Sequence, residues 1–157
     1  MKNFTKIFLS LFYVGYIKFA PGTCGTLASL LIMFFLLEIL VLPLSSLIII
    51  FIIIFFISNF LINYYSKFTK SHDSEHIVID EFLGIFFIFL FYEQLFIYND
   101  FLTYTFIFFV FRIFDITKVF PANYFDKKFQ NGYGVILDDI VAGLYTILTL
   151  LLLNGFI

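Results

Sequence analysis

Two pairs of adjacent carboxylates stand out in an otherwise apolar chain. Asp80-Glu81 and Asp138-Asp139 each come immediately before an apolar run. Helix capping and the positive end of the helix dipole explain one acidic residue at such a position. They do not explain two, because neighbouring residues of a helix point about 100° apart. Carboxylate oxygens brought together from two helices are suited to a hard cation, Mg²⁺ before Ca²⁺.

A third polar motif supplies charge of the opposite sign. Arg112, Asp115 and Lys118 are spaced three apart and would share one face of a helix. Ordinary intrahelical salt bridges are one explanation of this spacing. The functional alternative is that Arg112 or Lys118 holds a phosphate while Asp115 helps to bind the metal.

The segment Ala-Pro-Gly-Thr-Cys-Gly-Thr-Leu at residues 20–27 could surround an anion with backbone N–H groups and hydroxyls. A turn that leads into an apolar helix would have the same composition. The segment is not a Walker loop, because no Lys-Ser/Thr follows at the required spacing. Cys24 has no arginine six residues downstream, which excludes the loop of a cysteine-based phosphatase.

The composition shows what surrounds these residues. Of 157 residues, 62% are hydrophobic and 13% charged, with a mean hydropathy of +1.07. Soluble domains are about 45–50% apolar and about 25% charged, so the chain is expected to lie in a lipid bilayer. A net charge of −2 gives no sign of a nucleic-acid-binding surface, and one cysteine excludes an internal disulfide framework.

The polar motifs must be positioned by helices. The chain lacks the alternating pattern of a membrane barrel, and an open sheet leaves unpaired edges in lipid, so an all-α fold is expected. Some apolar runs are shorter than the roughly 20 residues that span a bilayer and would dip into it. A soluble bundle with a very apolar core is the alternative. About five helices are predicted, at residues 27–42, 44–62, 82–92, 101–111 and 140–153.

The chain shows no internal repeat or linker and is interpreted as one domain, residues 1–157. Its apolar N-terminal stretch, residues 7–17, lacks the small-residue cleavage pattern of a signal peptide. This stretch is expected to be retained and to lie along the membrane interface.

The basic residues predict the orientation in the membrane. All nine lysines and arginines fall in three polar stretches, residues 1–26, 63–81 and 112–139. Alternating helices would place these stretches on one side of the membrane, which the positive-inside rule identifies as cytoplasmic. The acid pairs and the basic motif would then meet there.

Together these motifs resemble phosphatidylglycerophosphatase A, a small bacterial membrane phosphatase. The resemblance covers most of the chain, from residue 20 to residue 143. It rests on residues 20–27, Ile-Val-Ile-Asp-Glu-Phe-Leu-Gly at 77–84, Phe-Arg-Ile-Phe-Asp-Ile-Thr-Lys at 111–118 with Pro121 and Asp126, and Gly-Tyr-Gly-Val-Ile-Leu-Asp-Asp-Ile-Val-Ala-Gly at 132–143.

The resemblance implies an all-helical, Mg²⁺-dependent enzyme and, with the charges above, a set of roles. The predicted metal ligands are Asp80, Glu81, Asp115, Asp138 and Asp139. The predicted phosphate-binding residues are Gly22, Thr23, Thr26, Arg112 and Lys118. The residues predicted to be catalytic are Asp80, Asp115, Lys118 and Asp139.

Two positions depart from the pattern of the family. Val119-Phe120-Pro121 keeps only the second proline of a usual pair, which leaves the local turn open. Position 24 is commonly a bulky apolar residue in the family, so Cys24 is interpreted as a packing residue and not as a nucleophile.

The expected activity is metal-assisted hydrolysis of phosphatidylglycerophosphate to phosphatidylglycerol and inorganic phosphate, a step of phospholipid biosynthesis. The expected location is the bacterial cytoplasmic membrane, crossed several times, with the site facing the cytoplasm and no obligate protein partner. Two alternatives are a phosphatase of another lipid phosphate and a small transporter or channel subunit. Acids spaced through the spans would favour a transporter, whereas these acids gather at one interface.

Overall fold

The computed structural model describes residues 2–69, 76–95, 99–129 and 131–155. Within these ranges the fold is all-helical and contains no strand, as predicted. Lys70, Asp73 and Glu75, which the sequence assigns to the cytoplasmic side, lie outside the described residues. The α-helices are α1 (Lys2–Leu9), α2 (Pro21–Phe34), α3 (Leu44–Thr69), α4 (Ile79–Phe89), α5 (Tyr92–Leu95), α6 (Asp100–Thr117), α7 (Ala122–Lys128) and α8 (Gly132–Asn154).

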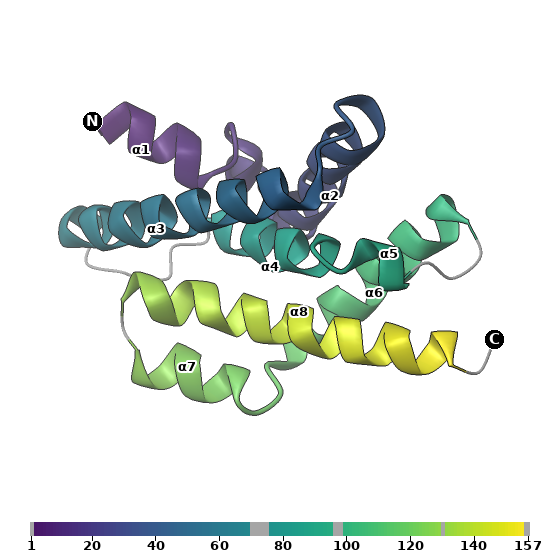
Figure 1. Cartoon of the computed structure of the whole chain (residues 1–157). Coiled ribbons are helices and arrows are strands. Elements are labelled where there is room, and N and C mark those ends of the chain that lie inside the picture. Colours follow the sequence, from purple (N-terminus) through teal and green to yellow (C-terminus); the bar gives the residue numbers. More distant parts are fainter. Residues whose placement is uncertain (1, 70–75, 96–98, 130, 156–157) are drawn as a thin grey trace.

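The short helix α4 lies at the centre of the bundle, between α3 and α8 (Figure 1). It packs against α2, α3 and α8, and its residues Phe82, Leu83, Ile85, Phe86 and Ile88 are all buried. A helix that is apolar on all sides is expected in such a position. With 11 residues α4 rises only about 16 Å, so it does not span a bilayer by itself.

Three helical segments are long and apolar enough to cross a membrane: Pro21–Ile39, Leu44–Tyr65 and Gly132–Asn154. The first joins α2 to a turn of π-helix, Phe35–Ile39. On α3 an outward stripe at i, i+4, i+7 and i+11 is apolar and exposed, formed by Ile49, Ile53, Phe56 and Phe60. A soluble bundle would cover such a stripe, so its exposure favours a membrane protein.

The N-terminal segment is packed into the fold. Helix α1 contacts α3, and the backbone N–H of Val78, just before α4, donates to the Leu9 carbonyl at 3.0 Å. A Cβ at Gly15 would lie 2.2 Å from the His76 carbonyl oxygen, so this close contact requires glycine. The N-terminal segment therefore helps to fix where α4 begins.

Several helix boundaries predicted from hydropathy are wrong. Helix α8 begins at Gly132 and not near Ile140, because the amide oxygen of Asn131 accepts from the Gly134 N–H at 3.1 Å and caps the helix there. Helix α6 continues past residue 111 to Thr117. Hydropathy detects contact with lipid, whereas helices continue into polar sequence where their side chains find partners. Asp138 and Asp139 consequently lie in the second turn of α8 and not before the helix.

Candidate functional site

Three carboxylates from two helices form a compact cluster. Asp80 and Glu81 lie in the first turn of α4, and Asp139 comes from α8. One oxygen of each lies within 4.8 Å of the others. Asp80 Oδ1 and Glu81 Oε2 are buried without a hydrogen-bond partner in the described structure. Buried oxygens of this kind are costly unless a cation satisfies them, so the donor set fits a hard divalent ion.

These acids do not cap their helices. The residue before α4 is Val78, which has no side-chain acceptor, and α8 is capped by Asn131. Neither pair supplies the N-cap residue of its helix, although Asp80 and Glu81 lie in the first turn of α4, at the positive end of its dipole. The carboxylates of Asp80, Glu81 and Asp139 instead face one another.

Two glycines allow α4 and α8 to approach closely. A Cβ at Gly84 would lie 2.8 Å from the Asp139 carbonyl oxygen and from the Phe111 ring. A Cβ at Gly143 would lie 2.9 Å from the Gly84 carbonyl oxygen. Gly84 follows Asp80 by four residues and Gly143 follows Asp139 by four, so each glycine lies one turn beyond a clustered acid. The repeated Asp-x-x-x-Gly spacing is a signal that the sequence analysis missed.

Burial and mutual repulsion make it costly for the carboxyl groups of the cluster to be ionised without a nearby cation. Burial, followed by the charge of Glu81, raises the pKa of the Asp80 carboxyl well above its usual range. Burial also raises the pKa of Glu81 to about 7, with a smaller contribution from the charge of Asp115. A cation bound among these groups would favour their ionised forms.

The end of α6 brings both basic residues of the predicted site to the cluster. Arg112 donates through Nη1 to Asp115 Oδ2, three residues along the same helix. Lys118 adopts the left-handed conformation at the C-cap, and its Nζ lies 2.8 Å from Asp138 Oδ2 on α8. Of these two pairs, Arg112–Asp115 is an intrahelical salt bridge. The other pair joins α6 to α8.

The first turn of α2 completes the site. A Cβ at Gly22 would lie 2.5 Å from Glu81 Oε1 and 3.2 Å from Arg112 Nη1, so a larger residue here would displace the ends of these two side chains. Thr23 is partly buried in the same turn. The buried Thr26 hydroxyl donates to the Gly22 carbonyl at 2.9 Å. Residues 21–27 are thus the start of α2 and not a separate loop, so an anion here would meet the N-terminus of this helix.

All the predicted site residues come from the ends of four helices that meet at one end of the bundle. Asp80, Glu81 and Asp139 form the cluster. Asp115 and Asp138 each pair with a cation beside it, while Gly22 contacts Glu81 and Arg112 directly. An arrangement of clustered acids flanked by an arginine and a lysine can hold a metal ion and a phosphate side by side.

Comparison with known proteins gives concordant matches. Residues 7–154 match the sequence model of a family described as phosphatidylglycerophosphatase A. A protein of that name from Haemophilus influenzae is 33% identical over 137 residues, 85% of this chain and 78% of that protein. One from Escherichia coli is 33% identical over 129 residues, 82% of this chain and 71% of that protein.

A Bacteroides thetaiotaomicron protein whose name describes a phosphatidylinositol-3-phosphatase is 31% identical over 140 residues, covering 84% of this chain and 82% of that protein. No solved structure matches the chain.

Proposed function

Because the chain belongs to the phosphatidylglycerophosphatase A family, we propose that it hydrolyses the phosphomonoester of phosphatidylglycerophosphate, releasing phosphatidylglycerol and inorganic phosphate. The observation that carries this proposal is the acid cluster with two orphaned buried oxygens, flanked by Arg112 and Lys118. A phosphomonoester dianion requires cationic neutralisation of this kind in a site shielded from water.

The cofactor proposed for this site is Mg²⁺. Asp80, Glu81 and Asp139 would hold it, with Asp115 and Asp138 as further predicted ligands close by. When bound, the ion would polarise the phosphoryl group and would acidify a water molecule. Mg²⁺ is favoured over softer metals because every candidate ligand is a carboxylate oxygen.

The protein's own groups orient the phosphate. Arg112 lies against the first turn of α2, beside Gly22, so its guanidinium can bind a phosphate oxygen and keep its contact with Asp115. The Lys118 ammonium is more exposed, with 36% of its side chain accessible, and is placed to neutralise charge on the outer side of the phosphate. Thr23 offers a hydroxyl from α2. Binding a phosphate would require little rearrangement of side chains, because Asp115 and Asp138 already hold Arg112 and Lys118 in place.

We propose that the protein is oriented in the membrane with the site at the cytoplasmic surface. The starts of α2, α4 and α8 meet there with the end of α6. The opposite helix ends also gather: the Tyr92 hydroxyl donates to Asp100 Oδ1 at 2.6 Å, and Asn154 Nδ2 donates to the Gln94 carbonyl at 2.9 Å. The positive-inside rule assigns the basic end to the cytoplasm.

A second candidate substrate is another lipid phosphate. The relative from Bacteroides, named for activity on a phosphoinositide, favours this alternative. Both substrates are phosphomonoesters on a diacylglycerol lipid, so the cluster would serve either one.

The test is phosphate release by the purified protein in detergent micelles. Phosphatidylglycerophosphate, a phosphatidylinositol phosphate and phosphatidic acid are compared at equal surface concentration, with Mg²⁺ and after chelation. We expect fastest release from phosphatidylglycerophosphate and loss of activity on chelation. Faster release from another lipid phosphate would overturn the substrate assignment, and full activity in chelator would overturn the metal assignment.

A further inference from the structure

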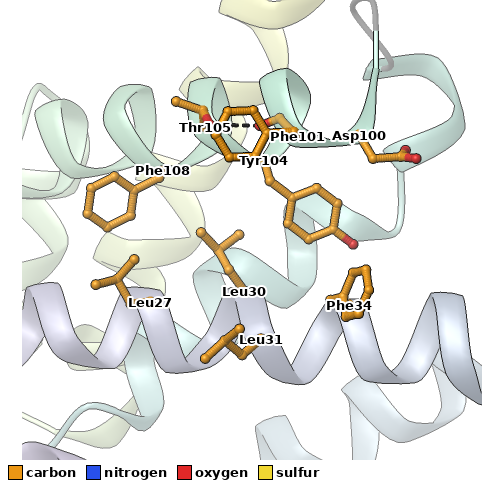
Figure 2. Close-up of a pocket in the computed structure, with 9 residues that line it drawn as sticks. All are labelled: Leu27, Leu30, Leu31, Phe34, Asp100, Phe101, Tyr104, Thr105 and Phe108. Atoms are coloured by element: carbon orange, nitrogen blue, oxygen red, sulfur yellow. Dashed lines mark hydrogen bonds between the residues drawn. The ribbon is translucent and has the colours of Figure 1, made fainter.

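A long apolar groove lies between α2 and α6. It encloses about 660 Å³, within the range of small-molecule sites. Figure 2 shows side chains of the two helices facing each other across it. The walls are Leu27, Leu30, Leu31 and Phe34 from α2, and Asp100, Phe101, Tyr104, Thr105 and Phe108 from α6.

The two walls continue into the candidate site. On α2, Thr23 precedes Leu27 by four residues, and on α6, Arg112 follows Phe108 by four. Residues four apart lie on the same face of a helix, so both walls change from apolar to polar at the same end of the groove. The contact of Gly22 with Arg112 shows that the helices are adjacent there.

Two aromatic rings meet at the other end of the groove. The rings of Phe34 and Tyr104 meet edge to face, with centroids 6.3 Å apart. Along its side the groove is open, because Leu31 and Phe101 are 70% and 78% exposed. A ligand can therefore enter laterally, as from a bilayer, with one end at the acid cluster.

We propose that this groove holds one acyl chain of the lipid substrate, with the glycerol end at Thr23 and Arg112. This inference rests on the proposed lipid phosphatase function and deepens it. An acyl chain fits the observations because the occupant must be linear and apolar, and must be joined to an anion at the end where the acids and Arg112 lie. A groove running from Leu27 to Phe34 is about 10 Å long, which accommodates part of a chain and leaves the remainder in lipid.

The groove is expected to position the lipid substrate more than to increase its binding affinity. Lipid tails are as apolar as the leucines that line it, so moving a chain from bilayer to groove gains little free energy. Confining the chain instead fixes where the phosphate lies relative to Arg112 and the cluster. Misplacement of about 1 Å can cost two orders of magnitude in rate, so this positioning has a measurable consequence.

Filling the groove tests the proposal. Thr105→Trp and Leu31→Trp introduce a large ring from opposite walls, so that one variant remains if the other fails to fold. The control is Leu148→Trp on α8, where the leucine is 47% exposed and does not line the groove. Phosphate release is compared for a substrate with long acyl chains and for its dibutyryl analogue, in micelles at equal surface concentration.

We expect the groove variants to lower the long-chain rate about tenfold or more relative to the dibutyryl rate, with the control variant unchanged. The groove proposal would be overturned if the groove variants kept the wild-type ratio of long-chain rate to dibutyryl rate, either because neither rate changed or because both fell equally. If the unaltered protein released no phosphate from any lipid, the proposed function would fail instead.

A binding measurement separates the two proposals further. The chain contains no tryptophan, so each of the three variants carries a single indole fluorophore. In an Asp139→Asn background with chelator present, which is expected to slow turnover by about 100-fold or more, a lipid phosphate with brominated chains should quench the fluorescence of the Thr105→Trp and Leu31→Trp variants saturably. The Leu148→Trp control should stay near its background level. Equal quenching by a brominated lipid without the phosphate would identify ordinary surrounding lipid and overturn the proposal. Failure of both groove variants to be quenched would overturn it as well.

Discussion

The five acids of the site differ in their partners. Asp115 and Asp138 each face a cation, whereas Asp80, Glu81 and Asp139 face mainly one another. Removing a charge from the second group relieves repulsion and leaves no ion pair broken. The fold should therefore tolerate that change better than the chemistry does.

Asp80→Asn and Asp139→Asn should each lower phosphate release by about 100-fold or more and leave the helical content unchanged. The substitution keeps the side-chain size but removes a carboxylate ligand. Excess Mg²⁺ should partly restore the rate, because the loss lies in metal affinity. Release is measured against Mg²⁺ concentration, with the exposed Glu93→Gln as the control. Wild-type rates with wild-type Mg²⁺ dependence would make the cluster purely structural.

Lys118→Ala should respond differently to added Mg²⁺. It removes a predicted phosphate contact and not a metal ligand, so activity should fall without any rescue by Mg²⁺. Measuring KM and kcat separately shows whether the contact already exists with bound substrate or only in the transition state. Restoration by excess Mg²⁺ would contradict the role given to this residue.

Cys24→Ala should retain most of the activity. The thiol contacts the Phe19 carbonyl, with 3.6 Å between Sγ and the oxygen, and the chain lacks the nearby arginine that a cysteine phosphatase requires. Turnover by the purified variant is the measurement. A loss of several orders of magnitude in a folded protein would indicate a covalent mechanism.

The raised pKa of Glu81 predicts how pH affects the metal-free protein. Folding shifts this pKa from 4.5 to about 7, so the folded state binds more protons than the unfolded state between these values. Stability is then greatest below the lower value and falls as pH rises through the higher one. Melting temperatures in chelator should show this fall, and Glu81→Gln should flatten it. An unchanged slope in Glu81→Gln would show that another group causes the effect.

Mg²⁺ should stabilise the protein more at about pH 8 than at about pH 5. Ion binding requires ionised carboxylates, and protons compete for them at the lower pH. Melting temperatures with and without Mg²⁺ at both pH values provide the comparison.

At the scale of helices, the close crossing of α4 and α8 decides whether the site exists. Each helix supplies an acid one turn before a glycine, and the backbones meet at Gly84 and Gly143. Close approach through small residues is a common means of packing membrane helices. The short length of α4 is compatible with this role, because it is surrounded by other helices and need not span the bilayer.

Gly84→Ala should move α4 and α8 apart and separate Asp80 from Asp139. The added methyl would lie 2.8 Å from backbone and ring atoms that have little room to move. We expect a loss of stability of about 1–3 kcal/mol and at least a tenfold loss of activity. Gly155→Ala is the control, because its added Cβ would meet no atom closer than 3.5 Å. Thermal unfolding and phosphate release of both variants are compared, and equal behaviour would contradict the packing argument.

At the scale of the whole molecule, the two ends of the bundle should face opposite sides of the membrane. In a Cys24→Ala background, a cysteine replacing Lys128 should react with an impermeant maleimide only from the cytoplasm. A cysteine replacing the exposed Glu93 should react only from outside. Labelling of both positions from the same side would contradict the proposed orientation, although the site could still form.

The sequence by itself determined the fold class, and it supplied the residues proposed for the candidate site and a composition that favours a membrane environment. Composition favours lipid, and lipid in turn requires helices because backbone groups must pair within each segment. Adjacent acids such as Asp80 and Glu81 are conspicuous in an apolar chain because burying charge is costly. These properties depend on residue type and spacing, which the sequence displays directly.

Only the tertiary structure decided which partners those residues have. Lys118 pairs with Asp138 on another helix and not with Asp115, because the left-handed turn at the end of α6 redirects its side chain. The start of α8 at Gly132 depends on a cap by Asn131 that hydropathy does not detect. The groove arises only where α2 and α6 lie against each other. Partners of this kind depend on how distant segments pack, and spacing along the chain does not specify that packing.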